Sequence, residues 1–438
     1  MKSKGLLTAS FLLLVLSGII WWSNKKAATA EKTPIEKTAT SLISIPQDQF
    51  QEIEIRKRGG EAVQLRRVDS QWQIAGAKPL RADPEATSSL LSSLSSLSSD
   101  RTVEEKSASL DEYGLTQPAI ELDMTDKNRK TARILIGDKT PAGTAVYAAI
   151  AGDSRVFAVS SYKTSNFDKS ANDLRDKRML VFDTDKLSRV ELQAKKENIE
   201  FGRDKDGWQI VKPVPLRADQ SAVEELLRTL HDAKMDLSSG DDAKKVAAAF
   251  QTGTGVAIAR VADTSGMQEL QVRKSKDDYY AKSSAVESIY KIASNVGTAL
   301  DKNLDDFRNK KLFDFGYSDP EKVEIHDGPK SHLLSRSGSD WLSNGTNLDP
   351  ASATTLIGQI RDLTATKFAD HGFTTPVLDI TVTSDNGKRT EKVLISRDGD
   401  HFLAKRDGDA ALYELAASAV QELQTSEANL KPAAPAKK

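Results

Sequence analysis

Three aspartates stand at nearly regular intervals along the chain, and a carboxylate can bind a metal ion or act as a general base. Asp83 and Asp219 end the identical segments 79–83 and 215–219, Pro-Leu-Arg-Ala-Asp, and Asp349 holds the related place further on. A stretch with helical periodicity follows each of them. A carboxylate at that point accepts hydrogen bonds from the free N–H groups of the first helical turn. We therefore interpret Asp83, Asp219 and Asp349 as helix caps.

Three tryptophans keep step with these aspartates. Trp72 and Trp208 each lie 11 residues before the aspartate of their copy, and Trp341 lies 8 residues before its own. A tryptophan could serve as a stacking platform for a ligand. However, a large aromatic residue that returns at the same place is also what packing beneath a helix requires. We interpret Trp72, Trp208 and Trp341 as core residues.

Basic residues near the caps are a further candidate for binding. Arg81 and Arg217 could hold an anion near the start of each helix, but we expect them to cover apolar surface or to pair with a carboxylate. The segments 174–178 and 307–311, Leu-Arg-Asp-Lys-Arg and Phe-Arg-Asn-Lys-Lys, could contact lipid head groups or an acidic partner. We interpret these two segments as solvated helix ends.

The remaining candidates for chemistry form no recognised motif. The five histidines never occur at the His-x-x-x-His spacing of a zinc site, and the chain has no cysteine. Its glycines form neither a nucleophile elbow nor a phosphate-binding loop. The Asp-Gly-Asp sequences at 398–400 and 407–409 are typical of hairpin turns, because they lack the other ligands of a calcium loop. We predict no catalytic residue, no cofactor and no metal ligand, although a site assembled from distant residues stays open.

The elements that carry the aspartates and tryptophans also recur. After each aspartate comes one apolar helical stripe: Leu90, Leu91, Leu94 and Leu97; then Leu226, Leu227, Leu230 and Ala233; then Leu356, Ile357, Ile360 and Leu363. In the third copy every offset from the tryptophan is three residues shorter, so a single deletion between Trp341 and Asp349 explains all of them. Three copies of one unit are therefore expected.

Each unit is predicted to combine strands with one long helix. Alternating runs at 53–55, 190–192 and 323–325 place a glutamate on the outward face of a strand. A Gly-x-x-x-Pro turn at 114–118 and 372–376 leads into further strands, and it is degenerate at 250–253 in the second copy. Strands interrupted by single helices indicate an α+β fold, with a mostly antiparallel sheet and one packed helix in each of three tandem repeats. We expect repeat units at 45–182, 183–316 and 317–425 and a disordered tail at 426–438.

The N-terminal segment predicts a membrane anchor. Residues 5–22 form an uncharged run of 18 residues that ends in two tryptophans, with lysines on both sides. We expect cytoplasmic residues 1–4, a transmembrane helix at 5–22 and a flexible linker at 23–44. The alternative is a signal peptide cleaved after Ala30, in the sequence Ala-Thr-Ala. The predicted location is the inner membrane, single-pass, with the C-terminal part periplasmic or otherwise extracytoplasmic.

Several of these features together resemble the bacterial domain-of-unknown-function family 4340. They are the leading span, the tryptophan followed by Pro-Leu-Arg-Ala-Asp and the leucine stripe, Tyr-Gly-Leu-Thr-Gln-Pro at 113–118, and Leu-Arg-Asp-Lys-Arg at 174–178. The resemblance implies an uncharacterised envelope protein, in some genomes near the parts of an ABC-type export or gliding-motility system. It brings no catalytic residue with it.

Three functions follow from these observations as hypotheses. The leading one is a non-enzymatic, membrane-anchored scaffold or auxiliary subunit of an ABC-type export-like membrane complex, attached to the inner membrane through residues 5–22 and bound to an envelope or transporter protein. The second is a periplasmic binding module for a glycan, peptide or lipid, and the third is an enzyme with an unrecognised site. With a net charge of -1, the chain has no overall positive charge to attract nucleic acid, and we expect no such partner.

Overall fold

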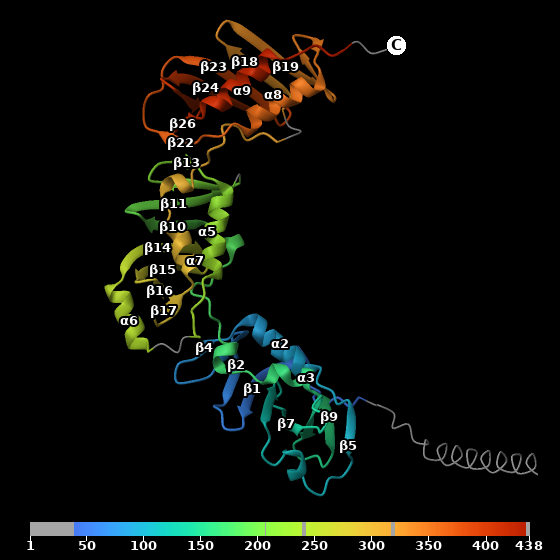
Figure 1. The fold of residues 1–438 in the computed structure, drawn as a ribbon. Helices are drawn as coiled ribbons and strands as arrows, with labels where there is room; N and C mark the ends of the chain where they lie inside the picture. Colours follow the sequence, from blue (N-terminus) through green and yellow to red (C-terminus); the bar gives the residue numbers. More distant parts are fainter. Residues whose placement is uncertain (1–38, 206, 239–241, 317–319, 435–438) are drawn as a thin grey trace, which may run out of the picture. The chain divides into compact units, whose positions relative to one another are not determined.

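The computed structural model describes residues 39–205, 207–238, 242–316 and 320–434, which form three antiparallel sheets, each with helices packed on it (Figure 1). The chain forms two compact units. The first ends at Lys177 and holds the first sheet, and the second begins at Arg178 and holds the other two. This architecture confirms the α+β fold of three repeated sheets.

The first sheet has nine strands in the order β4-β3-β2-β1-β6-β7-β8-β9-β5. Its strands are β1 (Phe50–Lys57), β2 (Val63–Val68), β3 (Gln71–Ile74), β4 (Leu80–Arg81), β5 (Arg101–Glu104), β6 (Ile120–Asp126), β7 (Thr131–Lys139), β8 (Ala145–Ile150) and β9 (Val156–Ser160). Its helices are α2 (Pro84–Ser95), α3 (Ser161–Thr164) and α4 (Ala171–Leu174).

The second sheet repeats this order with eight strands, β13-β12-β11-β10-β14-β15-β16-β17. They are β10 (Arg189–Ala194), β11 (Glu197–Asp204), β12 (Gly207–Lys212), β13 (Leu216–Arg217), β14 (Thr254–Asp263), β15 (Gly266–Ser275), β16 (Asp278–Ser283) and β17 (Tyr290–Ile292). The helices are α5 (Gln220–Asp232), α6 (Ala243–Thr252) and α7 (Ser294–Leu300).

The third sheet again has nine strands, β21-β20-β19-β18-β23-β24-β25-β26-β22. They are β18 (Lys322–Asp327), β19 (Lys330–Ser337), β20 (Asp340–Ser343), β21 (Thr346–Asn347), β22 (Lys367–Ala369), β23 (Pro376–Ser384), β24 (Arg389–Asp398), β25 (His401–Arg406) and β26 (Leu412–Leu415). Helices α8 (Pro350–Asp362) and α9 (Ala417–Ala428) pack against each other beside this sheet (Figure 1).

Alternation of apolar and polar residues produces one buried and one solvent-facing side of each sheet. In β1, Ile53 and Ile55 are fully buried while Glu54 between them is not. The apolar stripe of the long helix covers the buried side, as Leu90 and Leu94 of α2 illustrate. Each sheet thus has its own hydrophobic core.

The cores begin earlier in the chain than predicted. A short extended segment pairs with the chain at the end of each long helix, where Leu42 N–H donates to Leu97 O at 3.0 Å, Met179 N–H to Ala233 O at 2.8 Å and Leu312 N–H to Leu363 O at 3.0 Å. Residues 40–45, 178–182 and 311–315 supply apolar side chains to the sheet that follows them. These residues pack with the sheet that follows them, whereas the prediction placed 40–44 in the linker, 178–182 in the first unit and 311–315 in the second.

The second copy of the repeat, which contains the second sheet, differs from the predicted unit with one packed helix. Where a degenerate turn was expected at 250–253, the chain forms helix α6, which buries Val246 and Phe250 and contacts β15 and β16. Asp242 caps this helix by accepting from the N–H of Lys244 at 2.9 Å. The second copy therefore replaces a turn with a helix.

The predicted disordered tail is wrong for its first residues. Helix α9 continues to Ala428, and the chain then pairs with the start of α8, where Asp349 N–H donates to Lys431 O and Ala433 N–H donates to Asn347 O, both at 2.8 Å. In the first two sheets the cap aspartate makes the same bond to Leu174 O and to Phe307 O. Residues 431–433 thus supply the third copy of this pairing.

Among residues 39–434, apart from the gaps given above, no helix has the length and apolarity needed to cross a membrane. The expected cytoplasmic residues 1–4, the anchor at 5–22, Ala30 and the linker up to residue 38 all lie outside the described residues.

Candidate functional site

The structure places the three aspartates at helix N-caps. The carboxylate of Asp83 accepts from Ala86 N–H at 2.8 Å, that of Asp219 from Ala222 N–H at 3.1 Å, and that of Asp349 from Ser352 N–H at 2.9 Å. Each bond satisfies a donor that the helix itself cannot, which is worth about 1 kcal/mol. The three carboxylates thus have a structural role.

The tryptophans pack against the cores to different degrees. Trp208 is buried, with 4% of its surface exposed, whereas Trp72 and Trp341 are half-buried. The Trp208 ring also lines a cavity of about 330 Å³ beside α5, where the Arg203 guanidinium lies 5.8 Å from the ring centre. All three tryptophans therefore pack against a core, and Trp208 is the most deeply buried of them.

The two repeated arginines pair with carboxylates. Arg81 Nε lies 3.8 Å from Asp176 Oδ2 in the first sheet. In the second copy the place of Asp176 is taken by Asn309, which has no charge. Arg217 instead donates from Nη2 to both oxygens of Asp314, at 2.7 and 2.6 Å.

This last pair belongs to a larger network of charges in the second compact unit. Arg406 donates from Nη1 to Asp314 Oδ2 at 3.1 Å and from Nη2 to Glu391 Oε1 at 2.6 Å. Glu391, whose side chain is 2% exposed, also accepts from the backbone N–H of Asp314 at 3.0 Å. Such charge-assisted bonds are strong, and a buried carboxylate needs them to remain in the fold. These bonds hold Arg217 of β13, Asp314 of the extended segment 311–315 and Arg406 of β25 together.

A buried tyrosine extends the network. The Tyr413 hydroxyl donates to Asp409 Oδ2 at 2.6 Å and lies 3.4 Å from Arg217 Nη1. Burial, followed by the bond to the Asp409 carboxylate, raises the pKa of Tyr413 to about 12. Tyr413 therefore stays protonated and acts as a hydrogen-bond donor.

A polar cavity of about 620 Å³ adjoins this network. It is lined by Gln209, Arg217, Ala218, Gln220, Asn309, Asp314, Asp385 and Arg389. Amides, guanidinium groups and carboxylates converge there, so the cavity is suited to hold a hydrophilic molecule. Within the described part of the chain, no group of three histidine, aspartate or glutamate side chains has the geometry of a metal site.

No sequence motif points to Glu391 or to its partners Arg406 and Asp314. The partner residues are far apart in the sequence, so no motif unites them. One signal was present: Glu391, Val393 and Ile395 alternate on the buried side of β24, and a glutamate in an apolar series indicates a buried charge.

A second buried carboxylate was missed for a similar reason. Glu427 follows Val420 and Leu423 on the buried stripe of α9 and is 2% exposed. Its carboxylate oxygens accept no hydrogen bond from the described residues, and His332 Nε2 lies 3.5 Å away. Burial, and then the nearby charge of Asp327, raise the pKa of Glu427 to about 6.

The two Asp-Gly-Asp sequences lie in turns. Asp398 pairs with His401 at the end of the β24–β25 hairpin, and Gly399 between them has a φ of 61°. Gly408 has a φ of 73° in the turn that follows β25. Both sequences are hairpin connections, as predicted.

Comparison with known proteins identifies the family of this chain. No curated protein and no solved structure matches the chain. A family model, Domain of unknown function (DUF4340), matches twice, over residues 72–209 and 208–377. Each match begins at the tryptophan of one sheet and extends into the next, so the repeat unit of the family agrees with the repeat seen in the structure. Because the two matches cover more than half of the chain, the protein belongs to the DUF4340 family.

Proposed function

We propose that this protein is a non-enzymatic scaffold or auxiliary subunit of a membrane complex of the ABC-type export kind, anchored in the inner membrane by residues 5–22, with its folded part in the periplasm. The observation that carries this proposal is the threefold use of one unit, with the same cap and the same terminal pairing in each copy. Each copy therefore offers a partner a sheet of the same topology.

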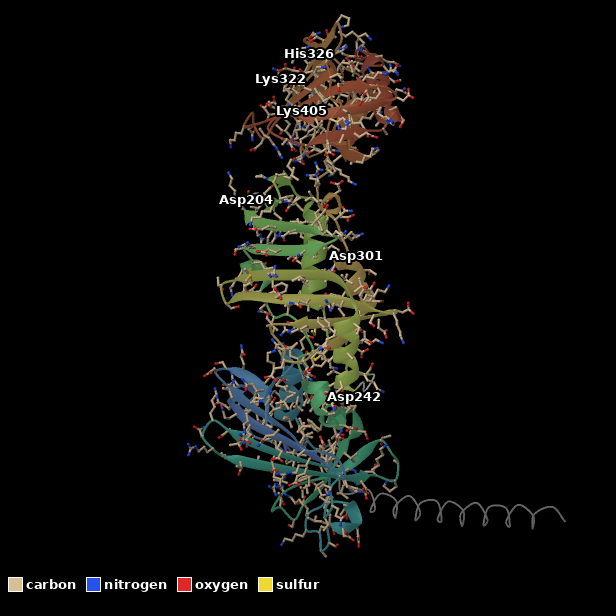
Figure 2. All side chains as sticks on the ribbon, turned by 90° about the vertical axis from the view of Figure 1, so that its left-hand side faces the viewer. Asp204, Asp242, Asp301, Lys322, His326 and Lys405 are labelled. Atoms are coloured by element: carbon tan, nitrogen blue, oxygen red, sulfur yellow. The ribbon has the colours of Figure 1, made fainter. Side chains whose placement is uncertain are left out.

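The solvent-facing side of each sheet supports a protein partner. These sides carry ion pairs between neighbouring strands. One example from each sheet is Arg56–Asp123 at 2.8 Å, Arg260–Glu269 at 2.7 Å and Lys392–Asp379 at 2.8 Å. Figure 2 shows charged side chains projecting from the sheets, with Lys322 of β18 among those labelled. Exposed ion pairs add little to stability. Arranged in a regular pattern, however, they give a partner electrostatic complementarity and a rapid association.

The distribution of exposed apolar residues is consistent with such a polar contact. The large ones are scattered over all three copies of the unit: Val68, Tyr162, Val211, Val214, Met267, Leu333 and Val377. Single exposed apolar residues are normal on a protein surface. A partner would therefore be recognised mainly by charge and shape.

Site-specific photo-crosslinking in cells tests the proposal. A photoreactive residue at Gln193, exposed on the outward side of β10, should trap a protein of a membrane complex. The same residue at Ser221, exposed on α5, is the matched control and should trap much less. Recovery of the anchored protein only as a free monomer under mild detergent, with no crosslink at Gln193, would refute the proposal.

A further inference from the structure

The polar cavity of the second compact unit has walls that the fold holds in place. Gln209 and Arg217 are cross-strand partners on β12 and β13, so their side chains project from the same side of the sheet. The Gln220 amide is held by the backbone of Trp208: its Oε1 accepts from Trp208 N–H at 2.8 Å and its Nε2 donates to Trp208 O at 2.7 Å. Arg217 is held by Asp314. These walls do not depend on a ligand for their position.

Other side chains that line the cavity make longer or fewer contacts with the rest of the protein. Arg389 makes only long contacts with its neighbours: Nη1 lies 3.4 Å from Asp314 O, Nη2 lies 3.8 Å from Asp314 Oδ2, and Nε lies 3.8 Å from Glu391 Oε2. Its side chain is 44% exposed. The side chains of Gln209 and Asp385 line the same cavity without a hydrogen bond to the described residues. A guanidinium donor, a carboxylate acceptor and an amide that does both are thus available together.

The chemistry of the lining selects one class of ligand. Ala218 is the one apolar residue among those lining the cavity, which disfavours a lipid chain or an apolar side chain. The two lining arginines and two lining aspartates balance in charge, which disfavours a strongly charged ligand. A sugar hydroxyl both donates and accepts, so it matches a wall that offers both kinds of group. The volume of about 620 Å³ lies in the ordinary range of ligand cavities.

We infer that this cavity binds a neutral saccharide through its hydroxyl groups, with Gln209, Asp385 and Arg389 as the recognising side chains. This binding site is additional to the proposed scaffold function and does not depend on it.

Saturation-transfer NMR and calorimetry on the full chain, in a polyoxyethylene detergent that carries no sugar head group, test the inference. The probes are maltotriose, cellotriose and chitotriose, each at about 10 mM, which is tenfold above a millimolar Kd. At least one should bind. Asp385→Asn and Arg389→Gln should each weaken that binding by about tenfold, because each replaces a charged hydrogen-bonding group by a neutral amide and so loses a charge-assisted bond.

The variants have matched controls. Asp385 has a φ of 53°, a conformation that asparagine adopts as readily, so Asp385→Asn leaves the backbone unstrained. Arg397→Gln changes another exposed arginine of β24, away from the cavity, and should leave binding unchanged. Binding of none of the three sugars, or binding that persists in both cavity variants, would overturn the inference. A response to trigalacturonate with none to the neutral sugars would also overturn it and point to an anion site.

Discussion

We expect the ionised side chain of Glu427 to destabilise the fold, because it is a buried carboxylate whose oxygens accept no hydrogen bond from the described residues. The pKa of Glu427 rises from 4.5 to about 6 in the folded chain. One unit of pKa difference corresponds to about 1.4 kcal/mol, so the ionised side chain destabilises the fold by about 2 kcal/mol. Glu427→Gln replaces the charge by a neutral group of the same shape and should recover this free energy.

The sign of the pH dependence follows from the raised pKa. The folded state binds the Glu427 proton more tightly than the unfolded state does, so the contribution of Glu427 to stability is greatest below pH 4.5 and is lost as the pH rises through 6. The advantage of Glu427→Gln should therefore be about 2 kcal/mol at pH 8 and should vanish near pH 4.5.

Amide hydrogen exchange of peptides from α8 and α9 measures this difference in the intact chain. Both proteins are compared at the same pH, so the intrinsic exchange rate cancels. Glu422→Gln is the matched control, because Glu422 is an exposed glutamate of the same helix. Repeating the pair in a His332→Gln background removes the imidazole whose Nε2 lies 3.5 Å from the Glu427 carboxylate. Equal protection of wild type and Glu427→Gln at pH 8, or a gain independent of pH, would refute the reasoning.

Two further predictions concern the helices. Asp219→Ala should lower the free energy of unfolding by about 1 kcal/mol, while Asp219→Asn, which can still accept from Ala222 N–H, should be nearly neutral; urea titration checks both, and equal losses would contradict the cap. Gly297→Ala in α7 would place a Cβ 2.0 Å from the Tyr279 ring and should cost about 2 kcal/mol or more. Gly358→Ala in α8 meets its nearest atom at 3.7 Å and should raise the melting temperature by gaining about 1 kcal/mol of helix propensity. Similar melting temperatures for these two alanine variants would contradict the packing seen around Gly297.

Local sequence determined the repeated unit. Regular spacing places the tryptophans, the cap aspartates and the apolar stripes at the same points of three successive sheets, because capping and one-sided burial are set within a few residues. The hairpin turns were predictable for the same reason. Helix α6 was not predicted, because its Phe250 occupies a place where the other copies have a turn, and packing of the helix against β15 and β16 depends on the tertiary structure.

Tertiary structure alone decided the charge network and the cavity. The network joins residues from segments far apart in the chain: Asp314, Glu391 and Arg406. They meet because β24 and β25 pair with each other beside the extended segment 311–315. Likewise, Lys431 and Ala433 find their backbone partners at the start of α8, in Asp349 and Asn347, far away in the sequence. Local patterns specify what each segment becomes, whereas the pairing of distant segments specifies which charged groups share a buried site.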